Sequence, residues 1–371
     1  MSGQSQRSIA YLCLETPREG QAAHTHVHEI IKGLRSRGWT IDLVTTGAGG
    51  AAGGGALWRR ALDYVLAQGR LVQRLSQFDA VYMRTHPAAL PASLLCALLG
   101  KPVIQEINGR PDDLVITYPW LRWLGWPLKA CYRWQMKWAA QVITVTEGLR
   151  LWAGAESGHS RVSLVPNGAN TDLFRPDGDK PADLGIYVAF VGGLVAWHGV
   201  ATMLSAIDRQ EWPEGVRLVV IGDGVERERL RAAKDHPRLV WLGRKPYAEV
   251  PTYLRGAIGA LCVIEDPDGR SSTGVAPLKL FEAMACGTAV IVTDLPFQAD
   301  VVRNEQAGIV IPVADPGALA KAVARLRDGP EDARQMGLRG SGYVRHHASW
   351  QVRAEETGVI IERALQPVRI A

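Results

Sequence analysis

The sequence predicts an α/β protein made of two Rossmann-like domains, each with a doubly wound parallel sheet. Its 371 residues are long for one domain and natural for two domains of roughly 180 residues. Short β-branched runs alternate with helix-length segments in both halves, which is typical of βαβ units. Hydrophobic residues make up 47% of the chain and charged residues 21%, the balance of a globular protein that can build two cores.

The alternating pattern gives the expected order of elements. Strands are expected at 9–14, 41–45, 80–83, 103–107, 142–145, 162–165, 186–191, 217–221, 239–242, 259–264 and 289–292. Proline and glycine around 177–183 indicate a linker. We therefore expect an N-terminal domain at 1–176 and a C-terminal domain at 184–347. The end of the chain is expected to be helical at 318–326, 331–346 and 350–365.

The stretch 271–294 predicts a phosphate site. It begins with a Ser/Thr/Gly loop, continues as a helix opened by Pro277 and closed before Gly287, and ends in a buried strand. The unpaired N–H groups and the positive dipole end of such a helix favour a phosphate. Lys279 and Glu282 are three residues apart and share a helix face. An ammonium can thus meet a phosphate while a carboxylate accepts hydrogen bonds from sugar hydroxyls.

The motif Pro277-x-Lys279-x-Phe281-Glu282 resembles the donor-binding motif of retaining glycosyltransferases of family 4, which have the two-domain GT-B fold. The resemblance covers most of 190–317 and a segment at 162–176. It implies that Lys279 and the helix start hold the donor diphosphate and that Glu282 binds the ribose. The first glutamate of the family pattern would fall on Gly274, which cannot contact the donor sugar as a carboxylate does. The resemblance also implies two domains facing a cleft, with a last helix at 348–371 that crosses back to the first.

The first glycine loop of the second half departs from the family pattern. An arginine and a lysine usually neutralise the diphosphate there, and Gly193 and His198 hold those places here. A neutral imidazole carries no charge, so more of the stabilisation is expected to come from Lys279. The Trp197-His198-Gly199 version also occurs in relatives with the same donor motif, so we interpret the two changes as linked. As an alternative, His198 is a helix cap or a packed core residue.

The resemblance also implies a wider nucleotide-sugar site. Arg244 and Lys245 lie where such enzymes hold the base, chiefly through backbone groups. As an alternative, their side chains are simply solvated. The residues expected to contact the nucleotide sugar are Gly20, Gly192, Gly193, Gly222, Arg244, Lys245, Thr273, Gly274, Val275, Ala276, Leu280 and Glu282.

Two polar residues end a strand in the first half. Glu106 and Asn108 share a side of the chain by the period of two. Family members commonly carry a histidine at the place of Asn108. An amide forms hydrogen bonds but does not move a proton, so we expect Asn108 to position the substrate. Glu106 is either an ion-pair partner at the strand end or an acceptor contact. With Lys279 and His198, these two residues complete the expected catalytic set.

No metal or cofactor is expected. His24, His26 and His28 alternate on the first helix, which spreads them around the axis instead of forming a metal face. They lie on the helix surface or cap it, or His24 or His26 contacts the substrate. The five cysteines are scattered without a CxxC pair, which indicates a reducing compartment and neither a zinc site nor a disulfide framework.

Two further segments spell familiar motifs without their usual context. The tract 47–56, GAGGAAGGGA, follows the second strand and lacks a GxGxxG that opens a helix, so we predict a flexible loop or lid. Residues 266–268 spell D-x-D within a Pro/Gly/Ser loop. The resembled family generally needs no metal, and we do not assign one to this loop.

The segment 114–140 combines tryptophans with purely basic charge. Five of the chain's twelve tryptophans fall in it, and no Asp or Glu occurs from 114 through 146. Spacing by four gives a basic stripe beside an aromatic stripe, which suits the interface of an anionic bilayer. The alternative is a helix packed on the first domain with its charges outward. Residues expected to contact the acceptor or the membrane are His24, His26, Trp120, Trp123, Lys129, Arg133, Trp134, Lys137 and Trp138.

The predicted function is that of a retaining, metal-independent hexosyltransferase. It would move a sugar from a nucleotide-diphosphate sugar to a glycan or a polyprenyl- or lipid-linked acceptor in bacterial surface polysaccharide or glycolipid assembly. A nucleotide-sugar epimerase of the same fold and a non-catalytic relative are the alternatives. The net charge of +5 is modest, so nucleic acid is not an expected partner. Without a signal peptide or an apolar run of about 18 residues, we expect a cytoplasmic protein, peripheral on the inner face of the membrane.

Overall fold

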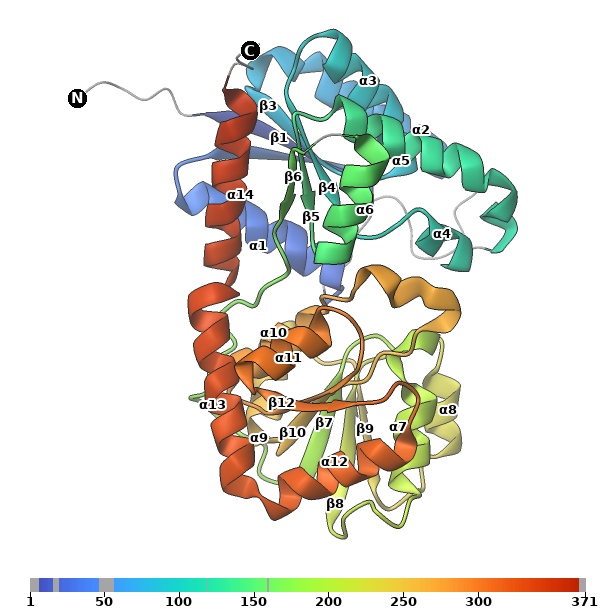
Figure 1. Cartoon of the computed structure of the whole chain (residues 1–371), viewed down its shortest axis with the longest axis vertical. Coiled ribbons are helices and arrows are strands. Elements are labelled where there is room, and N and C mark those ends of the chain that lie inside the picture. Colours follow the sequence, from blue (N-terminus) through green and yellow to red (C-terminus); the bar gives the residue numbers. More distant parts are fainter. Residues whose placement is uncertain (1–6, 16–19, 47–56, 118, 159, 367–371) are drawn as a thin grey trace, which may run out of the picture. The chain divides into compact units, whose positions relative to one another are not determined.

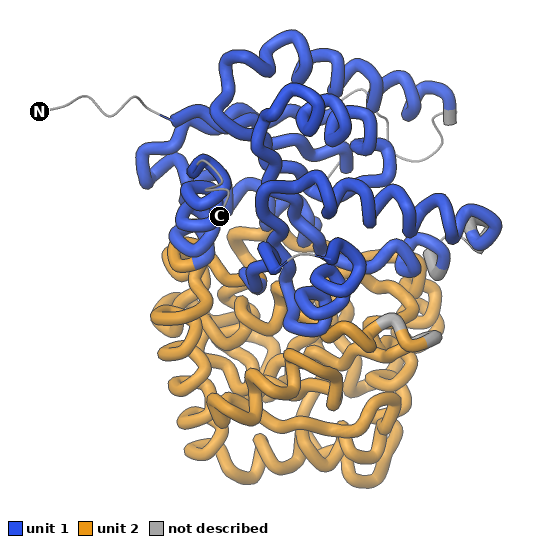
Figure 2. The backbone as a smooth tube through the Cα atoms, turned by 45° about the horizontal axis from the view of Figure 1, so that its top comes forward, with its two compact units in different colours: residues 1–166, 353–371 blue, residues 167–352 orange. Residues whose placement is uncertain are grey.

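The computed structural model describes residues 7–15, 20–46, 57–117, 119–158 and 160–366. The chain forms two compact units, one of residues 1–166 and 353–371 and one of residues 167–352 (Figure 2). The first division comes before the predicted linker at 177–183. This segment belongs to the second unit, where Arg255 donates hydrogen bonds to the carbonyl oxygens of Asp179 (3.0 Å) and Arg175 (3.5 Å). The glycine tract 47–56 lies outside the described residues.

The first unit contains a six-stranded parallel sheet in the order β2-β1-β3-β4-β5-β6. Figure 1 labels β1, β3, β4, β5 and β6 of this sheet. Its strands are β1 Ser8–Cys13, β2 Thr40–Thr45, β3 Ala80–Arg84, β4 Val103–Ile107, β5 Gln141–Thr144 and β6 Val162–Leu164. Its helices are α1 Ala22–Ser36, α2 Leu57–Gln73, η1 Leu75–Gln77, η2 Pro87–Ala89, α3 Leu90–Leu98, α4 Asp112–Thr117, η3 Pro119–Leu124, α5 Gly125–Trp138, α6 Glu147–Ser157 and, from residue 353 on, α14 Trp350–Leu365. The alternation of strands and helices with parallel pairing is the predicted βαβ pattern.

The helices α2, α3, α5 and α6 cover one face of this sheet. Ala67 of α2 and Ala92 of α3 pack with Leu12 of β1 in one buried cluster. Alternate residues of a strand share a face, so Val103 and Ile107 of β4 point the same way. Val103 belongs to the cluster under α2 and α3, and Ile107 belongs to the cluster under α5 and α6. The four helices are therefore one layer.

The second unit contains another six-stranded parallel sheet, in the order β12-β11-β10-β7-β8-β9. Its strands are β7 Ile186–Val191, β8 Val216–Ile221, β9 Leu239–Gly243, β10 Gly259–Cys262, β11 Val290–Thr293 and β12 Gly308–Ile311. Its helices are η4 Ala196–His198, α7 Val200–Ile207, α8 Arg227–Ala232, η5 Tyr247–Glu249, α9 Val250–Gly256, η6 Pro267–Thr273, α10 Leu278–Ala285, α11 Gln298–Glu305, α12 Pro316–Asp328, α13 Pro330–His347 and the start of α14 Trp350–Leu365.

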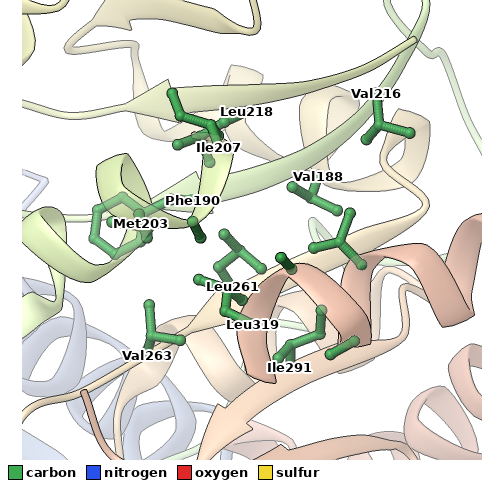
Figure 3. Packing of buried hydrophobic residues seen from close by; sticks show 14 of the residues in the cluster. Val188, Phe190, Met203, Ile207, Val216, Leu218, Leu261, Val263, Ile291 and Leu319 are labelled. Atoms are coloured by element: carbon green, nitrogen blue, oxygen red, sulfur yellow. The ribbon is translucent and has the colours of Figure 1, made fainter. Parts of the chain in front are cut away.

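One face of the second sheet is closed by an apolar core. Val188 and Phe190 of β7 meet Met203 of α7 and Leu319 of α12 in a single buried cluster (Figure 3). Burying such side chains stabilises the fold by about 1.5–3 kcal/mol each. This core holds the ends of the strands in place, and the loops that follow them build the site described below.

The prediction of two doubly wound parallel sheets is confirmed, and two details of it were wrong. The strand β12 was not predicted, because its four residues begin with Gly308, and glycine is weak in strands. Glycine is needed there because a Cβ at Gly308 would lie 1.9 Å from the carbonyl oxygen of Val290. Helix α10 begins at Leu278, and Pro277 is its N-cap residue in an extended conformation, not its first helical residue.

Candidate functional site

In the second unit, two glycine loops meet at the carboxyl ends of β7 and β8. Gly192 and Gly222 both have positive φ, +144° and +147°. A Cβ at Gly222 would lie 1.8 Å from the carbonyl oxygen of Gly192, so no other residue fits there. In open α/β sheets, ligands bind at this edge. The structure thus brings the predicted residues Gly192, Gly193 and Gly222 together at one edge.

Lys279 of α10 extends its side chain to the same loop. A Cβ at Gly192 would lie 3.3 Å from the Lys279 ammonium nitrogen. This nitrogen is inaccessible to solvent and has no hydrogen-bond partner among the described residues. It lies 4.2 Å from the centre of the Phe190 ring. Burial lowers the pKa of Lys279 to about 8, although the charges of Cys262 and Glu282 act to raise it.

The loop before α10 is held by backbone contacts. Gly274 has φ +88°, and its N–H donates to the carbonyl oxygen of Ser271 at 2.8 Å. The N–H of Val275 donates to the carbonyl oxygen of Pro296 at 3.1 Å. The N-cap residue of α10, Pro277, makes no side-chain cap hydrogen bond. Residues 273–276, all predicted contacts, thus lead directly into an uncapped helix start.

His198 closes the glycine loop from the other side. Its Nδ1 lies 2.6 Å from the carbonyl oxygen of Gly193. His198 and Gly193 are the two residues that stand where the family pattern has a lysine and an arginine. The N-cap position of α7 is held by Gly199, so the interpretation of His198 as a helix cap is wrong. The side chain is only partly buried, so it is not a packed core residue either. The imidazole instead fixes the conformation of the loop.

Glu282 lies one helical turn beyond Lys279 and is buried, with 7% of its surface exposed. The hydroxyl of Tyr247 donates to its Oε1 at 2.7 Å. Tyr247 was not predicted as a site residue, and its only signal was its position two residues after Lys245. The contact joins the start of η5 to α10, 35 positions apart in the sequence.

Arg244 and Lys245 follow β9 as predicted. Arg244 is exposed and lines an open hollow of about 420 Å³ with Asp223, Gly224, Val225, Arg227 and Glu228. The ammonium nitrogen of Lys245 lies 6.0 Å from the centre of the Tyr253 ring, at the limit of a cation–π contact. The hollow therefore borders the same Gly222 loop that meets Gly192.

In the first unit, Glu106 is the centre of a buried polar cluster at the end of β4. Its Oε2 accepts hydrogen bonds from the hydroxyls of Tyr82 (2.5 Å) and Tyr11 (3.3 Å) and lies 3.1 Å from Nε2 of His26. Its Oε1 accepts from the guanidinium of Arg84 at 2.8 Å and from the side-chain amide of Asn108. Of the two interpretations of Glu106, the structure shows the ion pair.

The cluster holds Glu106 as a carboxylate. Burial alone raises the pKa of Glu106, but His26, Arg84 and Tyr82 outweigh it and hold that pKa well below its ordinary value. Burial and then the charge of Glu106 raise the pKa of Tyr11 and of Tyr82 well above the ordinary value. Arg84 also contacts Glu15, with Nε 3.1 Å from its Oε2. Glu106 is therefore fully engaged and is not a free nucleophile or base.

The histidines of α1 have separate environments. The sequence allowed His26 to lie on the helix surface or to contact the substrate. In the structure it is only 5% exposed and faces Glu106, so it lies neither on the surface nor open to a substrate. His24 stacks on His28 with ring centres 3.9 Å apart, one helical turn along. Gly20 has φ +80° just before α1, a conformation that favours glycine.

The tryptophan-rich segment presents aromatic side chains to solvent. Trp123 and Trp126 are each 81% exposed and Trp134 is 48% exposed, whereas Trp138 is half-buried. The rings of Trp134 and Trp138 lie 5.6 Å apart, as the predicted stripe requires. The side chain of Trp120 lies outside the described residues.

The basic residues of this segment are mostly exposed as well. Arg133 and Lys137 point outward, and the ammonium of Lys137 lies 5.4 Å from the Trp134 ring. Lys129 is paired with Asp112 at 3.2 Å, which reduces the free charge of the predicted basic stripe. Over the described ranges, no helix is both long and apolar enough to cross a bilayer.

No three His, Cys, Asp or Glu side chains are grouped for a metal ion within the part of the chain that the structure describes. In the loop with the D-x-D spelling, Asp266 accepts a hydrogen bond from the backbone N–H of Ser271 at 2.5 Å. The neighbouring Glu265 accepts one from the hydroxyl of Thr202 at 2.6 Å. Both carboxylates thus have local structural partners.

Comparison with known proteins agrees with this architecture. The family model described as "Glycosyltransferase Family 4" matches residues 23–173, and that described as "Glycosyl transferases group 1" matches residues 185–328. The structure of sucrose-phosphate synthase from Thermosynechococcus elongatus superposes with a TM-score of 0.78 at 18% identity, over 96% of this chain and 98% of that one. The chain has the GT-B fold, and its two halves match the models of these two glycosyltransferase families. Anabaena HepE in complex with UDP and glucose is a second GT-B neighbour, with a TM-score of 0.69 at 14% identity, over 95% of this chain and 99% of that one.

Two curated relatives match part of the sequence of this chain. α-Maltose-1-phosphate synthase of Mycolicibacterium smegmatis is 29% identical over 248 residues, 59% of this chain and 62% of that protein. Phosphatidyl-myo-inositol mannosyltransferase of Mycobacterium tuberculosis is 32% identical over 190 residues, 49% of this chain and 48% of that protein. The chain thus spans between about half and two thirds of the length of these relatives.

Proposed function

We propose that the chain is a retaining glycosyltransferase that takes its sugar from a nucleotide-diphosphate donor. The observation that carries this proposal is the buried ammonium of Lys279 beneath the Gly192 loop, which has no hydrogen-bond partner among the described residues. A buried cation without a hydrogen-bond partner is costly for the free protein. A diphosphate at this edge would supply the missing acceptor oxygens and form charge-assisted hydrogen bonds.

The rest of the site supports a nucleotide sugar. The uncapped start of α10 offers backbone N–H groups and a positive dipole end to the same phosphates. Glu282, which accepts a hydrogen bond from Tyr247, would accept further hydrogen bonds from the ribose hydroxyls. The hollow beside Arg244 would receive the base. Anabaena HepE, which shares the fold, binds UDP and glucose.

We further propose that transfer retains the anomeric configuration without a protein nucleophile or a metal. The acceptor hydroxyl would attack the anomeric carbon from the side of the leaving diphosphate as the C–O bond to that phosphate breaks. The departing phosphate oxygen would take the hydroxyl proton. Lys279 and the α10 start would stabilise the negative charge that develops on the diphosphate. Glu106 is occupied by five partners, so its role would be to hold Asn108 at the sheet edge as a positioning group.

The acceptor would be a glycan or a polyprenyl- or lipid-linked molecule, as in bacterial surface polysaccharide or glycolipid assembly. The exposed Trp123, Trp126 and Trp134 support contact with an anionic membrane surface. Phosphatidyl-myo-inositol mannosyltransferase, a partial relative, acts on a lipid according to its name. The enzyme would work as a peripheral protein on the cytoplasmic side of the membrane.

A thermal-shift screen against UDP, GDP, dTDP and CMP, each with and without a divalent metal, tests the proposal. We expect one nucleoside diphosphate to stabilise the protein regardless of metal, and Lys279→Ala to remove both the shift and most turnover. A fully active Lys279→Ala protein would refute the assignment. Donor conversion without any acceptor would instead indicate an epimerase. Absence of any shift and any turnover would indicate a non-catalytic relative.

A further inference from the structure

Helix α2 has two apolar faces, and among the described residues only one of them is packed against the core. Ala67 and Leu71 are buried in the core cluster of the first sheet. Gln68 on the same side accepts a hydrogen bond from the backbone N–H of Ala92 in α3 at 3.1 Å. These contacts fix the orientation of α2 on the sheet.

The other face of α2 is apolar and faces solvent. Trp58 is 63% exposed, Val65 64% and Leu66 54%, and Leu62 and Val72 are 47% and 42% exposed. Positions 58, 62, 65 and 72 repeat at helical spacing, so they form one stripe. The stripe runs the full length of the 17-residue helix, about 25 Å. Contiguous exposed apolar surface of this kind marks an interaction site.

The charges beside this stripe are mostly positive. Helix α2 carries Arg59, Arg60 and Arg70, and Asp63 is its one acid. The guanidinium of Arg59 lies 5.2 Å from the centre of the Trp58 ring. An arginine stacked on an exposed tryptophan suits the headgroup region of a bilayer, where an apolar ring and a cation are both favoured.

Two other occupants fit this face less well. The ten residues before the helix, 47–56, are all glycine or alanine and offer no large side chain to cover the stripe. A second copy of α2 would bring two helices of the same net charge together, because each carries three arginines and one acid. Like charges in contact destabilise an interface. An anionic surface has the complementary charge.

The geometry points to α2 as a helix that lies flat in the interface of an anionic lipid bilayer, with Trp58, Leu62, Val65, Leu66 and Val72 inserted among the acyl chains. This inference deepens the proposed function and rests on it for the lipid-linked acceptor. Helix α3 belongs to the same layer (Figure 1), and its Leu94 and Leu98 and the following Leu99 are 41%, 74% and 62% exposed. Such a helix binds by apolar burial and by attraction of its arginines to the headgroups.

Vesicle flotation of the full chain tests the inference, using phosphatidylcholine vesicles with and without roughly one third phosphatidylglycerol. The variant combines Leu62→Gln, Val65→Gln and Leu66→Gln, because glutamine keeps helix propensity. We expect its partition to the anionic vesicles to fall at least about tenfold. Val359→Gln is the matched control, since this valine is 43% exposed on α14, whose Gly358 packs against Leu34 of α1. Its partition should stay unchanged.

Equal flotation of the triple variant and the wild type would overturn the inference. So would a wild type that does not bind anionic vesicles, or a wild-type dimer in sedimentation that the triple variant converts to a monomer. The nucleotide shift of the same proteins separates this inference from the proposed function. A triple variant that loses flotation and keeps its nucleotide shift supports both membrane binding by α2 and the proposed function. Vesicle binding by a protein that no nucleotide stabilises supports membrane binding by α2 and refutes the transferase function.

Discussion

The ammonium nitrogen of Lys279 lies 4.2 Å from the centre of the Phe190 ring. The face of an aromatic ring attracts a cation but accepts no ordinary hydrogen bonds, so the three donors of the ammonium are left unused among the described residues. Burial lowers the pKa of Lys279 to about 8, against an ordinary value of 10.5. The buried charge of Lys279 therefore destabilises the free protein, and an anionic ligand would remove this destabilisation.

We predict that nucleoside diphosphate binding takes up a proton between pH 8 and 9. A lysine is charged below its pKa, so with a pKa of about 8 the free protein is partly neutral at Lys279 in this range. A bound diphosphate favours the ammonium and raises the pKa again. Calorimetric titration in two buffers of different ionisation enthalpy should give different apparent binding enthalpies. Equal enthalpies in both buffers, or a difference that survives in Lys279→Met, would contradict this.

We predict that Lys279→Met stabilises the free protein at pH 7 while weakening nucleotide binding. The folded-state pKa of about 8 lies below the unfolded value of 10.5, so the unfolded chain binds more protons between them. The free energy of unfolding of the wild type therefore rises from pH 8 to 10.5. Below pH 8, Lys279 is charged in both states, and the full cost of burying its charge lowers the stability of the folded protein. The melting temperature of the variant should exceed that of the wild type by about 2 °C or more at pH 7, with a smaller gain at pH 10.

Lys321→Met is the control for that stability gain. Lys321 is on α12 of the same unit, and its side chain is 71% exposed. Its replacement should leave the melting temperature nearly unchanged, because surface substitutions are usually within about 0.5 kcal/mol. An equal gain from both substitutions would show that burial of Lys279 is not the cause.

We predict that Glu282→Gln weakens nucleoside diphosphate binding by about tenfold and leaves turnover of bound donor largely intact. Tyr247→Phe should act in the same direction, because the tyrosine hydroxyl holds Oε1 of Glu282 at 2.7 Å. If Glu282 binds the ribose, the wild type should prefer UDP or another ribonucleotide over its 2′,3′-dideoxy form. Glu282→Gln should largely lose that preference, and a preference of unchanged size would exclude the ribose role.

We predict that Glu106→Gln destabilises the protein by about 3–5 kcal/mol, because it leaves Arg84 and His26 buried with a weaker partner. The pKa of Glu106 is held well below its ordinary 4.5. The ionised carboxylate therefore stabilises the wild type fully above pH 4.5, and this stabilisation is lost only in stronger acid. Urea unfolding at pH 7 should show the loss, and the difference between the two proteins should shrink below pH 4.5. Glu15→Gln, at a side chain 38% exposed, should cost less than half as much.

We predict that the exposed tryptophans of α5 contribute to membrane binding and that Trp138 does not. Trp126 and Trp134 are 81% and 48% exposed, whereas Trp138 is half-buried beside Trp134. Trp126→Ala with Trp134→Ala should reduce flotation with anionic vesicles several-fold at an unchanged melting temperature. Trp138→Ala should lower the melting temperature and leave flotation of the folded protein as it was. No binding to anionic vesicles by the wild type would end the hypothesis.

Local sequence patterns were sufficient for the fold class and for part of the site. The alternation of β-branched runs and helical segments gave the strands to within one or two residues at most ends, because period and turn chemistry act over a few residues. The Lys279 and Glu282 pair could be placed on one helix face for the same reason. The short strand β12 was missed because four residues with a leading glycine carry too weak a signal.

Contacts between distant segments were decided only by the tertiary structure. His26 and Glu106 are 80 positions apart, and Tyr247 and Glu282 are 35 apart, yet each pair is within hydrogen-bonding distance. Strand order sets these contacts, and no local period reports it. The same holds for α2, whose sequence is apolar on two sides. Packing of Ala67 and Leu71 on the sheet decides that Trp58 and Val65 remain exposed, because a helix can turn only one of its faces to a single core.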